Sequence, residues 1–297
     1  MLQWRLPLGA ALILGLVALC WLDHRSSLPG AWLVPLALVF TLLASAEMLR
    51  LLAARQCDPE HWVVYIGNSL MVASSAVPLW WPEILPSLAW PALAFSFMVI
   101  AVFVVEMRRF AQPGNATIRA ATAILALVYV GWFLSFVVQM RGLGNGTWGV
   151  SAIASLIIVV KMCDTGAYTV GRLIGRHKMT PVLSPGKTVE GAIGGLAFAC
   201  LGAWLAIEWF LPRTLSAGAH AEPPANSRHW IWLVYGLAVG GAGILGDLAE
   251  SLLKRDAGVK DSGDWLPGFG GVLDLLDSIL LAVPVAYFFW ISGLIQP

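Results

Sequence analysis

The chain has 297 residues, of which 59% are hydrophobic and only 12% are charged, and its mean hydropathy is +0.78. Soluble globular domains carry about twice that share of charged residues, so this composition excludes one and predicts an integral membrane protein. The formal net charge of +1 gives no indication of a nucleic-acid partner, and the sequence has no basic tail, so no nucleic-acid partner is predicted.

Apolar runs long enough to cross a bilayer recur along the whole chain. The first run is interpreted as a retained helix, because no small-residue cleavage site clearly follows it. We therefore predict an all-α, polytopic membrane fold of about nine transmembrane helices, at residues 6–22, 31–53, 62–81, 85–105, 121–140, 148–170, 189–211, 230–250 and 272–294.

The placement of Lys and Arg predicts the orientation of these helices. With the N-terminus inside, the inside segments carry 13 of the Lys and Arg residues and the outside segments carry four, while Lys161 lies within a span. The positive-inside rule therefore places the N-terminus inside and the C-terminus outside.

Polar residues divide the chain into two predicted regions. Residues 1–145 are predicted to form an N-terminal transmembrane scaffold, in which Glu47 and Glu106 lie near span ends and can reach water at little cost. Residues 146–297 are predicted to form a catalytic transmembrane region, because polar residues enter the spans and the inside loops are rich in charge. The four cysteines have no CxxC spacing and indicate neither a zinc site nor a disulfide framework.

The first polar segment is VVKMCDTGAYTVGRLIGRHK, residues 159–178. Lys161 and Asp164 are three residues apart, so a helix places them on one face, where they can neutralise each other. A buried ion pair that only fixes helix packing explains them equally well. His177 is interpreted as a solvated loop residue rather than a ligand or an acid.

The second segment is TPVLSPGKTVEG, residues 180–191. Ser184, Lys187 and Thr188 offer two hydroxyls and one ammonium, which suit a phosphate. The GKT triplet is not a P-loop, because that motif requires glycine where this chain has Pro181. A helix that begins near Lys187 could still bind an anion at its N-terminus, and an ordinary charged loop is the alternative.

The third segment, residues 246–277, holds ten charged residues between two very apolar runs. Asp247 and Glu250 are three residues apart at the inner end of one predicted span, and Asp274 and Asp277 have the same spacing at the start of the next. Carboxylate pairs on helices that enter from the same side can converge on a hard cation such as Mg²⁺.

Between these carboxylate pairs lie Lys254, Arg255 and Lys260, which can hold phosphates. They are followed by the turn PGFGG at residues 267–271, whose glycines let the backbone approach a ligand. Acids that hold a metal beside cations that hold phosphates are typical of phosphoryl or nucleotidyl transfer. A charged loop that obeys the positive-inside rule explains the three cations but not the paired acids.

The third segment resembles the signature of the phosphatidate cytidylyltransferase (CDP-diacylglycerol synthase) family, S-x-x-K-R-x4-K-D-x-[GSA]-x-x-[LI]-[PG]-G-H-G-G-x-x-D-R-x-D. The matching residues are Ser251, Lys254, Arg255, Lys260, Asp261, Gly263, Leu266, Pro267, Gly268, Gly270, Gly271, Asp274 and Asp277, without an insertion. GDLAES, DTGAY and SPGKTVEG also look like that family. Two positions depart from it: Phe269 stands in place of histidine, and Leu275 in place of arginine, whose fork of donors leucine cannot replace.

The resemblance implies transfer of CMP from CTP to phosphatidic acid, which gives CDP-diacylglycerol and pyrophosphate in phospholipid biosynthesis. It implies Mg²⁺ as cofactor and a monovalent cation such as K⁺ near the same acids. The implied partners are CTP, phosphatidic acid and the lipid bilayer, and a homodimer is compatible with it. The implied location is the bacterial inner membrane, with the active site facing the cytoplasm.

The resemblance also implies roles for individual residues. The implied catalytic residues are Asp247, Asp274, Lys254 and Arg255. The implied substrate-binding residues are Ser184, Lys187, Thr188, Lys260, Gly268, Gly270 and Gly271. Asp247 and Asp274 would hold Mg²⁺, and Asp277, Glu250 and Asp164 would support or complete the ion site.

Other functions stay open at this point. A CTP-dependent polyprenol or phytol kinase would release CDP rather than pyrophosphate. A catalytically impaired paralogue is the alternative that Phe269 and Leu275 raise. A secondary transporter could carry Lys161, Asp164 and Asp247 at membrane depth, and it predicts flux without turnover of CTP. The CDP-alcohol phosphatidyltransferases are excluded, because their DGxxAR motif is absent.

Overall fold

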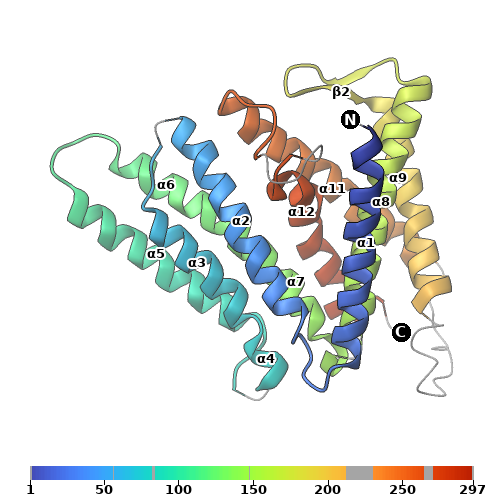
Figure 1. The fold of residues 1–297 in the computed structure, drawn as a ribbon, viewed down its shortest axis with the longest axis horizontal. Coiled ribbons are helices and arrows are strands. Elements are labelled where there is room, and N and C mark those ends of the chain that lie inside the picture. The colour runs from blue at the N-terminus through green and yellow to red at the C-terminus, as the bar shows by residue number, and fades with distance from the viewer. Residues whose placement is uncertain are drawn as a thin grey trace. The chain divides into compact units, whose positions relative to one another are not determined.

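The computed structural model describes residues 2–55, 57–81, 84–146, 148–211, 230–263 and 270–295. In this part of the chain the fold is helical apart from one antiparallel hairpin of β1 (Lys178–Thr180) and β2 (Ser184–Thr188) (Figure 1). The predicted all-α fold is confirmed, while the hairpin falls in a segment that the sequence predicts as a loop.

Among the described residues, eight helical stretches are long and apolar enough to cross a membrane. They are α2 (Leu33–Ala54), His61–Trp80 with α3 (His61–Ser74) and α4 (Val77–Trp80), α5 (Ala89–Arg109), Ala116–Arg141, α8 (Gly149–Ile174), Val189–Trp209, α11 (Ile231–Asp256) and α12 (Val272–Ile291). They match eight of the nine predicted runs, which confirms a polytopic membrane protein. The remaining run, residues 6–22, lies within α1 (Leu2–Arg25), and the count of nine and the orientation stay predictions.

The chain forms two compact units. The first consists of Met1–Gly142 with Leu253–Leu276, and the second of Leu143–Leu252 with Asp277–Pro297. In the C-terminal part of the chain, the units meet at two boundaries. One lies between Leu252 and Leu253 in α11, and the other lies between Leu276 and Asp277 in α12. The functional division at residues 145 and 146 stays a prediction.

In the first unit, α2, α3 and α5 pack against a long helix made of α6 (Ala116–Ala126), a π-helical turn η1 (Leu127–Trp132) and α7 (Phe133–Arg141). The π-helical turn is held by a buried polar contact, because the Gly131 N–H donates to Asn68 Oδ1 at 3.2 Å. Asn68 Nδ2 in turn donates to Ser45 Oγ at 2.8 Å. A Cβ atom at Gly131 would lie 2.8 Å from Asn68 Cα, so this approach requires glycine.

A buried ion pair fixes α1 to the end of α7 within the same unit. The Arg141 guanidinium donates to Asp23, and the two side chains are 3% and 0% exposed. Asp23 also accepts hydrogen bonds from the backbone N–H groups of Gly30 and Trp32, at 3.1 and 2.9 Å. Every charge in this pair therefore has a partner, as burial requires.

In the second unit, α8 packs along α9 (Val189–Trp204), which continues into a π-helical turn η3 (Leu205–Phe210), and a short 3₁₀ turn η2 (Leu143–Gly146) precedes α8. Small residues allow this close approach, since a Cβ atom at Gly166 of α8 would lie 2.8 Å from the Gly194 carbonyl oxygen of α9. The hairpin joins the ends of these two helices (Figure 1).

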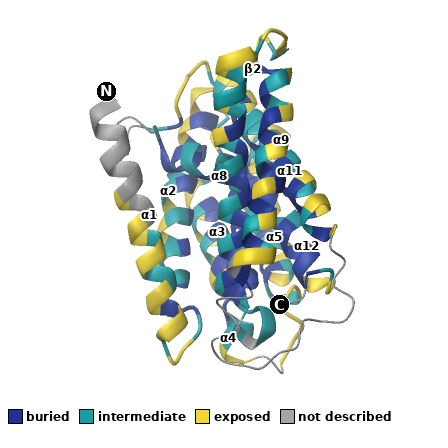
Figure 2. Ribbon diagram, turned by 90° about the vertical axis from the view of Figure 1, so that its right-hand side faces the viewer, coloured by how far each residue is buried: buried dark blue, intermediate teal, exposed yellow. Residues whose placement is uncertain are grey.

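Large apolar side chains remain exposed on helices of both units, as in a protein surrounded by lipid. On α5 they include Phe97 and Ile100, which are 64% and 58% exposed, and on α9 Ile193 is 64% exposed. Figure 2 shows exposed residues alternating with buried ones along these helices. Such a surface agrees with the predicted bilayer environment.

Candidate functional site

The predicted site residues fall into two groups, each described within its own unit. The first unit holds Lys254, Arg255, Lys260, Gly270, Gly271 and Asp274. The second unit holds Asp164, Ser184, Lys187, Thr188, Asp247, Glu250 and Asp277. Gly268 and Phe269 lie outside the described residues.

Asp274, in the first turn of α12, has every one of its carboxylate oxygens bonded. Lys254 Nζ lies 2.5 Å from Oδ1, and the two side chains are 11% and 10% exposed. Oδ2 accepts hydrogen bonds from the Gly271 N–H at 2.8 Å and from the Ser262 N–H at 2.9 Å, and the Ser262 hydroxyl oxygen lies 2.8 Å from it. The bond to Gly271 is the return bond of a capping box, which satisfies an N–H at the start of the helix.

Glu47 is a site residue that the sequence did not indicate. Its side chain is fully buried, so the prediction that it reaches water from a span end is wrong. The backbone N–H groups of Val272 and Leu273 each donate to its carboxylate at 2.8 Å, and the Ser262 hydroxyl donates at 2.8 Å. The sequence feature that points to Glu47 is a carboxylate within an apolar run, because such a residue is by default a candidate functional residue.

The glycines after the undescribed residues 264–269 fit tightly around these two acids. Gly270 has a φ of +89°, a left-handed conformation that glycine adopts without strain. A Cβ atom at Gly271 would lie 2.5 Å from Glu47 Cδ. The close approach to Glu47 thus explains why residue 271 is a glycine, independently of its predicted role in substrate binding.

Arg255 and Lys260 lie on exposed positions of the first unit. Arg255 Nη1 donates to the Val259 carbonyl oxygen at 3.1 Å, which holds the chain as it leaves α11. Their exposure leaves both side chains accessible to an anionic ligand. Leu275, the second departure from the family signature, is half-buried on α12.

In the second unit, three aspartates gather with two lysines. Lys187 Nζ lies 2.7 Å from Asp247 Oδ2, and these side chains are 22% and 34% exposed. Lys161 Nζ donates to Asp164 Oδ2 at 3.0 Å, which confirms the predicted pairing on one helix face. Asp277 interacts electrostatically with Asp247 and Asp164, which carry the same charge, and with Lys161. Asp164 and Asp247 are thus each paired with a lysine in this unit.

The hairpin positions Lys187 directly before α9. Thr188 is the N-cap of this helix, and its hydroxyl oxygen accepts a hydrogen bond from the Gly191 N–H at 3.1 Å. Glu190, in the first turn of α9, accepts hydrogen bonds from the backbone N–H groups of Arg176 and His177 at 3.0 and 3.1 Å. Glu190 therefore fastens the segment that follows α8 to the start of α9.

His177 is exposed, as predicted for a solvated loop residue, and its Nδ1 lies 2.5 Å from Glu190 Oε1. Glu250 is fully buried on α11, six residues before the end of that helix. Ser251 Oγ lies 3.5 Å from Asp247 Oδ1, at the limit of a hydrogen bond. The predicted part of Glu250 in an ion site stays a prediction.

The donor set of the described residues is suited to Mg²⁺, although these residues do not enclose an ion by themselves. Among the described residues, no group of three or more His, Cys, Asp and Glu side chains is arranged to hold a metal ion. Mg²⁺ is commonly bound through one or two carboxylates together with substrate phosphates, so a complete protein cage is not required. The aspartates provide hard oxygen donors, and lysines balance their charge in this structure.

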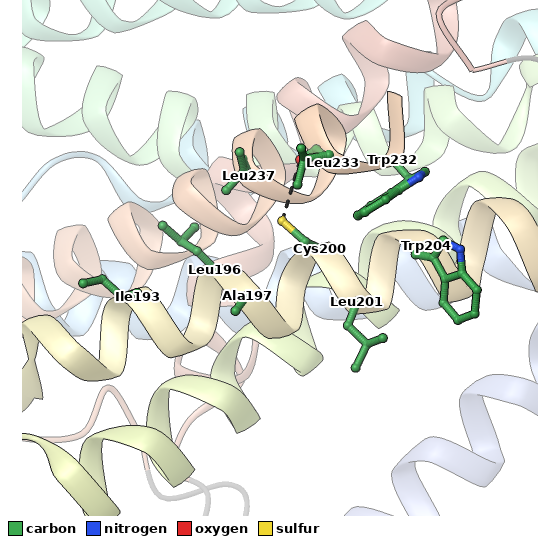
Figure 3. A pocket seen from close by; sticks show the side chains of 9 residues that line it. All are labelled: Ile193, Leu196, Ala197, Cys200, Leu201, Trp204, Trp232, Leu233 and Leu237. Atoms are coloured by element: carbon green, nitrogen blue, oxygen red, sulfur yellow. Dashed lines mark hydrogen bonds between the residues drawn. The ribbon is translucent and has the colours of Figure 1, made fainter. Parts of the chain in front are cut away.

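The second unit also contains an apolar cavity of about 730 Å³ between α9 and α11 (Figure 3). It is lined by Ile193, Leu196, Ala197, Cys200, Leu201, Trp204, Trp232, Leu233 and Leu237. Its lining contains no charged side chain that could balance the charge of a phosphate or a hard metal ion.

Comparison with known proteins gives a consistent result over nearly the whole chain. Residues 4–292 match the model of the cytidylyltransferase family. The chain is 34% identical to the phosphatidate cytidylyltransferase of Staphylococcus aureus strain COL over 257 residues, which are 86% of this chain and 88% of that protein. It is 35% identical over 193 residues to the phosphatidate cytidylyltransferases of Staphylococcus saprophyticus and Staphylococcus epidermidis, which covers 65% of each chain.

Proposed function

Since this chain belongs to the cytidylyltransferase family, we propose that it transfers CMP from CTP to phosphatidic acid and gives CDP-diacylglycerol and pyrophosphate. The observation that carries the proposal is the pairing of acids with lysines in the segments that resemble the family, above all Lys187 with Asp247 and Lys254 with Asp274. In each pair, a lysine that we propose to bind phosphate lies beside an acid that we propose to bind a metal ion.

The proposed reaction needs charge neutralisation more than it needs a base. A phosphate oxygen of phosphatidic acid forms a bond to the α-phosphorus of CTP. The bond between that phosphorus and the oxygen that bridges to the β-phosphorus breaks, and pyrophosphate leaves with this electron pair. The attacking phosphate is already anionic, so the protein has to position the two anions and balance their charge.

The lysines are the proposed phosphate-binding groups. In the second unit, Lys187 exchanges its bond to Asp247 for a bond to a phosphate oxygen of CTP, and the Ser184 and Thr188 hydroxyls donate nearby. In the first unit, Lys254, Arg255 and Lys260 provide further positive charge. A lysine that is held by a carboxylate in the ligand-free protein is already oriented, which lowers the entropy cost of binding.

The aspartates are the proposed metal ligands. In the second unit, Asp247 and Asp277 each provide a carboxylate oxygen, and Asp164 and Glu250 support them. Asp274 of the first unit is proposed as a further Mg²⁺ ligand. Bound Mg²⁺ would supply charge neutralisation for the triphosphate and its leaving group. A monovalent cation near the same acids follows from the family resemblance.

The membrane-spanning fold supports the proposed lipid substrate. Phosphatidic acid and CDP-diacylglycerol are both membrane lipids, so an integral membrane enzyme can act on their head groups while their acyl chains stay in the bilayer. We further propose that the charged loops face the cytoplasm, where CTP is found, and that the protein lies in the bacterial inner membrane. A homodimer is compatible with this arrangement.

Product analysis tests the proposed function directly. The purified protein is incubated with phosphatidic acid, Mg²⁺ and CTP labelled in the cytidine, and the lipid phase and the released phosphates are measured. We expect label in the lipid and one pyrophosphate per labelled lipid. Release of CDP with unlabelled lipid would instead identify a lipid kinase, and flux in proteoliposomes without turnover of CTP would identify a transporter.

A further inference from the structure

We propose that Glu47 of α2 is a positioning residue, whose buried carboxylate holds Ser262 and the start of α12 so that Asp274 keeps its orientation. This inference rests on the proposed function, in which Asp274 belongs to the reactive site. It assigns a role in that site to a residue of the predicted N-terminal scaffold. The argument depends only on residues of the first unit.

The contacts of Glu47 are those of a group that fixes the start of a helix. Its two carboxylate oxygens accept the N–H groups of Val272 and Leu273, both at 2.8 Å. These are the first two residues of α12, whose N–H groups have no acceptor within the helix. A carboxylate at this end also interacts favourably with the helix dipole. The charge of Glu47 is therefore stabilised by α12 although the side chain is fully buried.

Ser262 links Glu47 to Asp274. Its hydroxyl oxygen lies 2.8 Å from Glu47 Oε2 and 2.8 Å from Asp274 Oδ2. A hydroxyl has one hydrogen, so it donates to one carboxylate at a time. The Ser262 N–H donates to Asp274 as well, at 2.9 Å. The two acids thus hold the same serine, and a displacement of Glu47 changes the hydrogen bonds that orient Asp274.

Packing leaves Glu47 in one position. Cβ atoms built at Gly263 and Gly271 would lie 3.0 and 2.5 Å from Glu47 Cδ, so the backbone on both sides of residues 264–269 closes directly onto this carboxyl group. Glutamine has nearly the same shape, but its amide nitrogen would face an N–H group where the carboxylate offers an oxygen. Glu47→Gln therefore tests the hydrogen bonds with little change in volume.

Glu106 provides a matched control in the same unit. It is another buried glutamate, 7% exposed, and its charge is balanced by Arg119 at 2.7 Å rather than by the start of α12. Glu47→Gln and Glu106→Gln remove the same charge from similarly buried positions. A difference between them therefore reports the contacts of Glu47 and not the general effect of neutralising a buried acid.

The experiment measures hydrogen exchange in the ligand-free protein and steady-state kinetics in the presence of Mg²⁺. For Glu47→Gln we expect amides of residues 272–276 to exchange about tenfold faster, since a buried hydrogen bond is lost. We expect kcat to fall about ten- to a hundredfold, the range for groups that orient metal ligands, with little change in the KM for CTP. Glu106→Gln should leave both quantities unchanged.

Ser262→Ala keeps the inference testable if Glu47→Gln does not fold. It removes the link but leaves the two bonds from α12 to Glu47, so we expect a fall in kcat without faster exchange at Val272 and Leu273. In the double variant the losses in kcat should be smaller than additive, because the two residues act through one contact.

The outcomes separate this inference from the proposed function. Absence of labelled lipid with the wild-type protein would refute the proposed function, while exchange at the start of α12 would still decide whether Glu47 holds this segment. Unchanged exchange in Glu47→Gln, an unchanged kcat in an active background, or equal effects of Glu47→Gln and Glu106→Gln would each overturn the inference.

Discussion

Lys254 and Asp274 form a short, nearly buried ion pair, in which Nζ lies 2.5 Å from Oδ1. Lys254 comes from the end of α11 and Asp274 from the first turn of α12. The pair therefore closes the loop that contains the family signature, and it joins a proposed phosphate-binding cation to a proposed metal ligand.

Asp274→Asn should abolish Mg²⁺-dependent incorporation of CTP into lipid, with a loss of at least about a hundredfold. Asparagine keeps the shape but loses the charge that balances Lys254, and it offers one acceptor oxygen in place of two. The measurement is the rate of labelled lipid formation at saturating CTP. Asp256→Asn is the control, since Asp256 is an exposed acid at the end of α11 that pairs with Arg55. An Asp274→Asn protein with normal activity would refute its assignment as a metal ligand.

Lys187→Ala should raise the KM for CTP about ten- to a hundredfold. A hydrogen bond to a charged group contributes about 1.5–3 kcal/mol, and each 1.4 kcal/mol corresponds to about tenfold in binding. Lys178→Ala is a suitable control, because Lys178 is an exposed lysine on the neighbouring strand of the same hairpin. If both variants change the KM equally, the effect belongs to the charge of the hairpin and not to a contact of Lys187.

Asp247→Asn should also abolish Mg²⁺-dependent incorporation of CTP into lipid, at every Mg²⁺ concentration tested. Asp247 is partly exposed and paired with Lys187, so its replacement removes a ligand without opening a cavity in the core. The measurement is a titration with Mg²⁺ at fixed CTP, with Asp256→Asn again as control. Retained activity with an unchanged Mg²⁺ requirement would contradict the proposed role.

Arg141→Met should destabilise the first unit by about 3–5 kcal/mol, because it leaves the buried charge of Asp23 without its partner. The double variant with Asp23→Asn should be less destabilised than Arg141→Met alone, since the unpaired charge is then removed. Both are measured as free energies of unfolding in the same detergent. Additive losses in the double variant would show that the two side chains do not depend on each other.

The two departures from the family signature test whether the chain is a competent enzyme. We expect the natural protein to turn over, because the signature acids and the Lys254–Arg255 pair are retained. Leu275→Arg and Phe269→His should raise the rate of lipid labelling, since arginine adds a fork of donors for phosphate. Turnover by the double variant alone would identify the natural chain as an impaired paralogue.

The transmembrane helices were predictable from the sequence because their signal is local. Each apolar run contains its own evidence for a helix of bilayer length, and the eight membrane-length helical stretches among the described residues each coincide with a predicted run. The Lys161–Asp164 contact is likewise local, since both residues lie one helical turn apart on α8.

The contacts between distant residues were not predictable in this way. Glu47 and Ser262 are separated by 215 residues, and no spacing rule connects them. The sequence showed a carboxylate near a span end and allowed it to reach water, whereas the fold brings the start of another helix to it. The hairpin was missed for a different reason, because its strands of three and five residues are too short to show an alternating pattern.

The π-helical turn at Leu127–Trp132 decides where its helix can lose a residue. A π-helical turn holds one residue more than an α-helical turn, so deletion of one residue within it restores an α-helical turn and keeps the direction of the following helix α7. Deletion of one residue within α7 would instead rotate the residues after it by about 100° around the helix axis. Arg141, at the end of α7, would then face away from Asp23. We therefore expect this long helix to accept a single-residue deletion in the π-helical turn but not in α7.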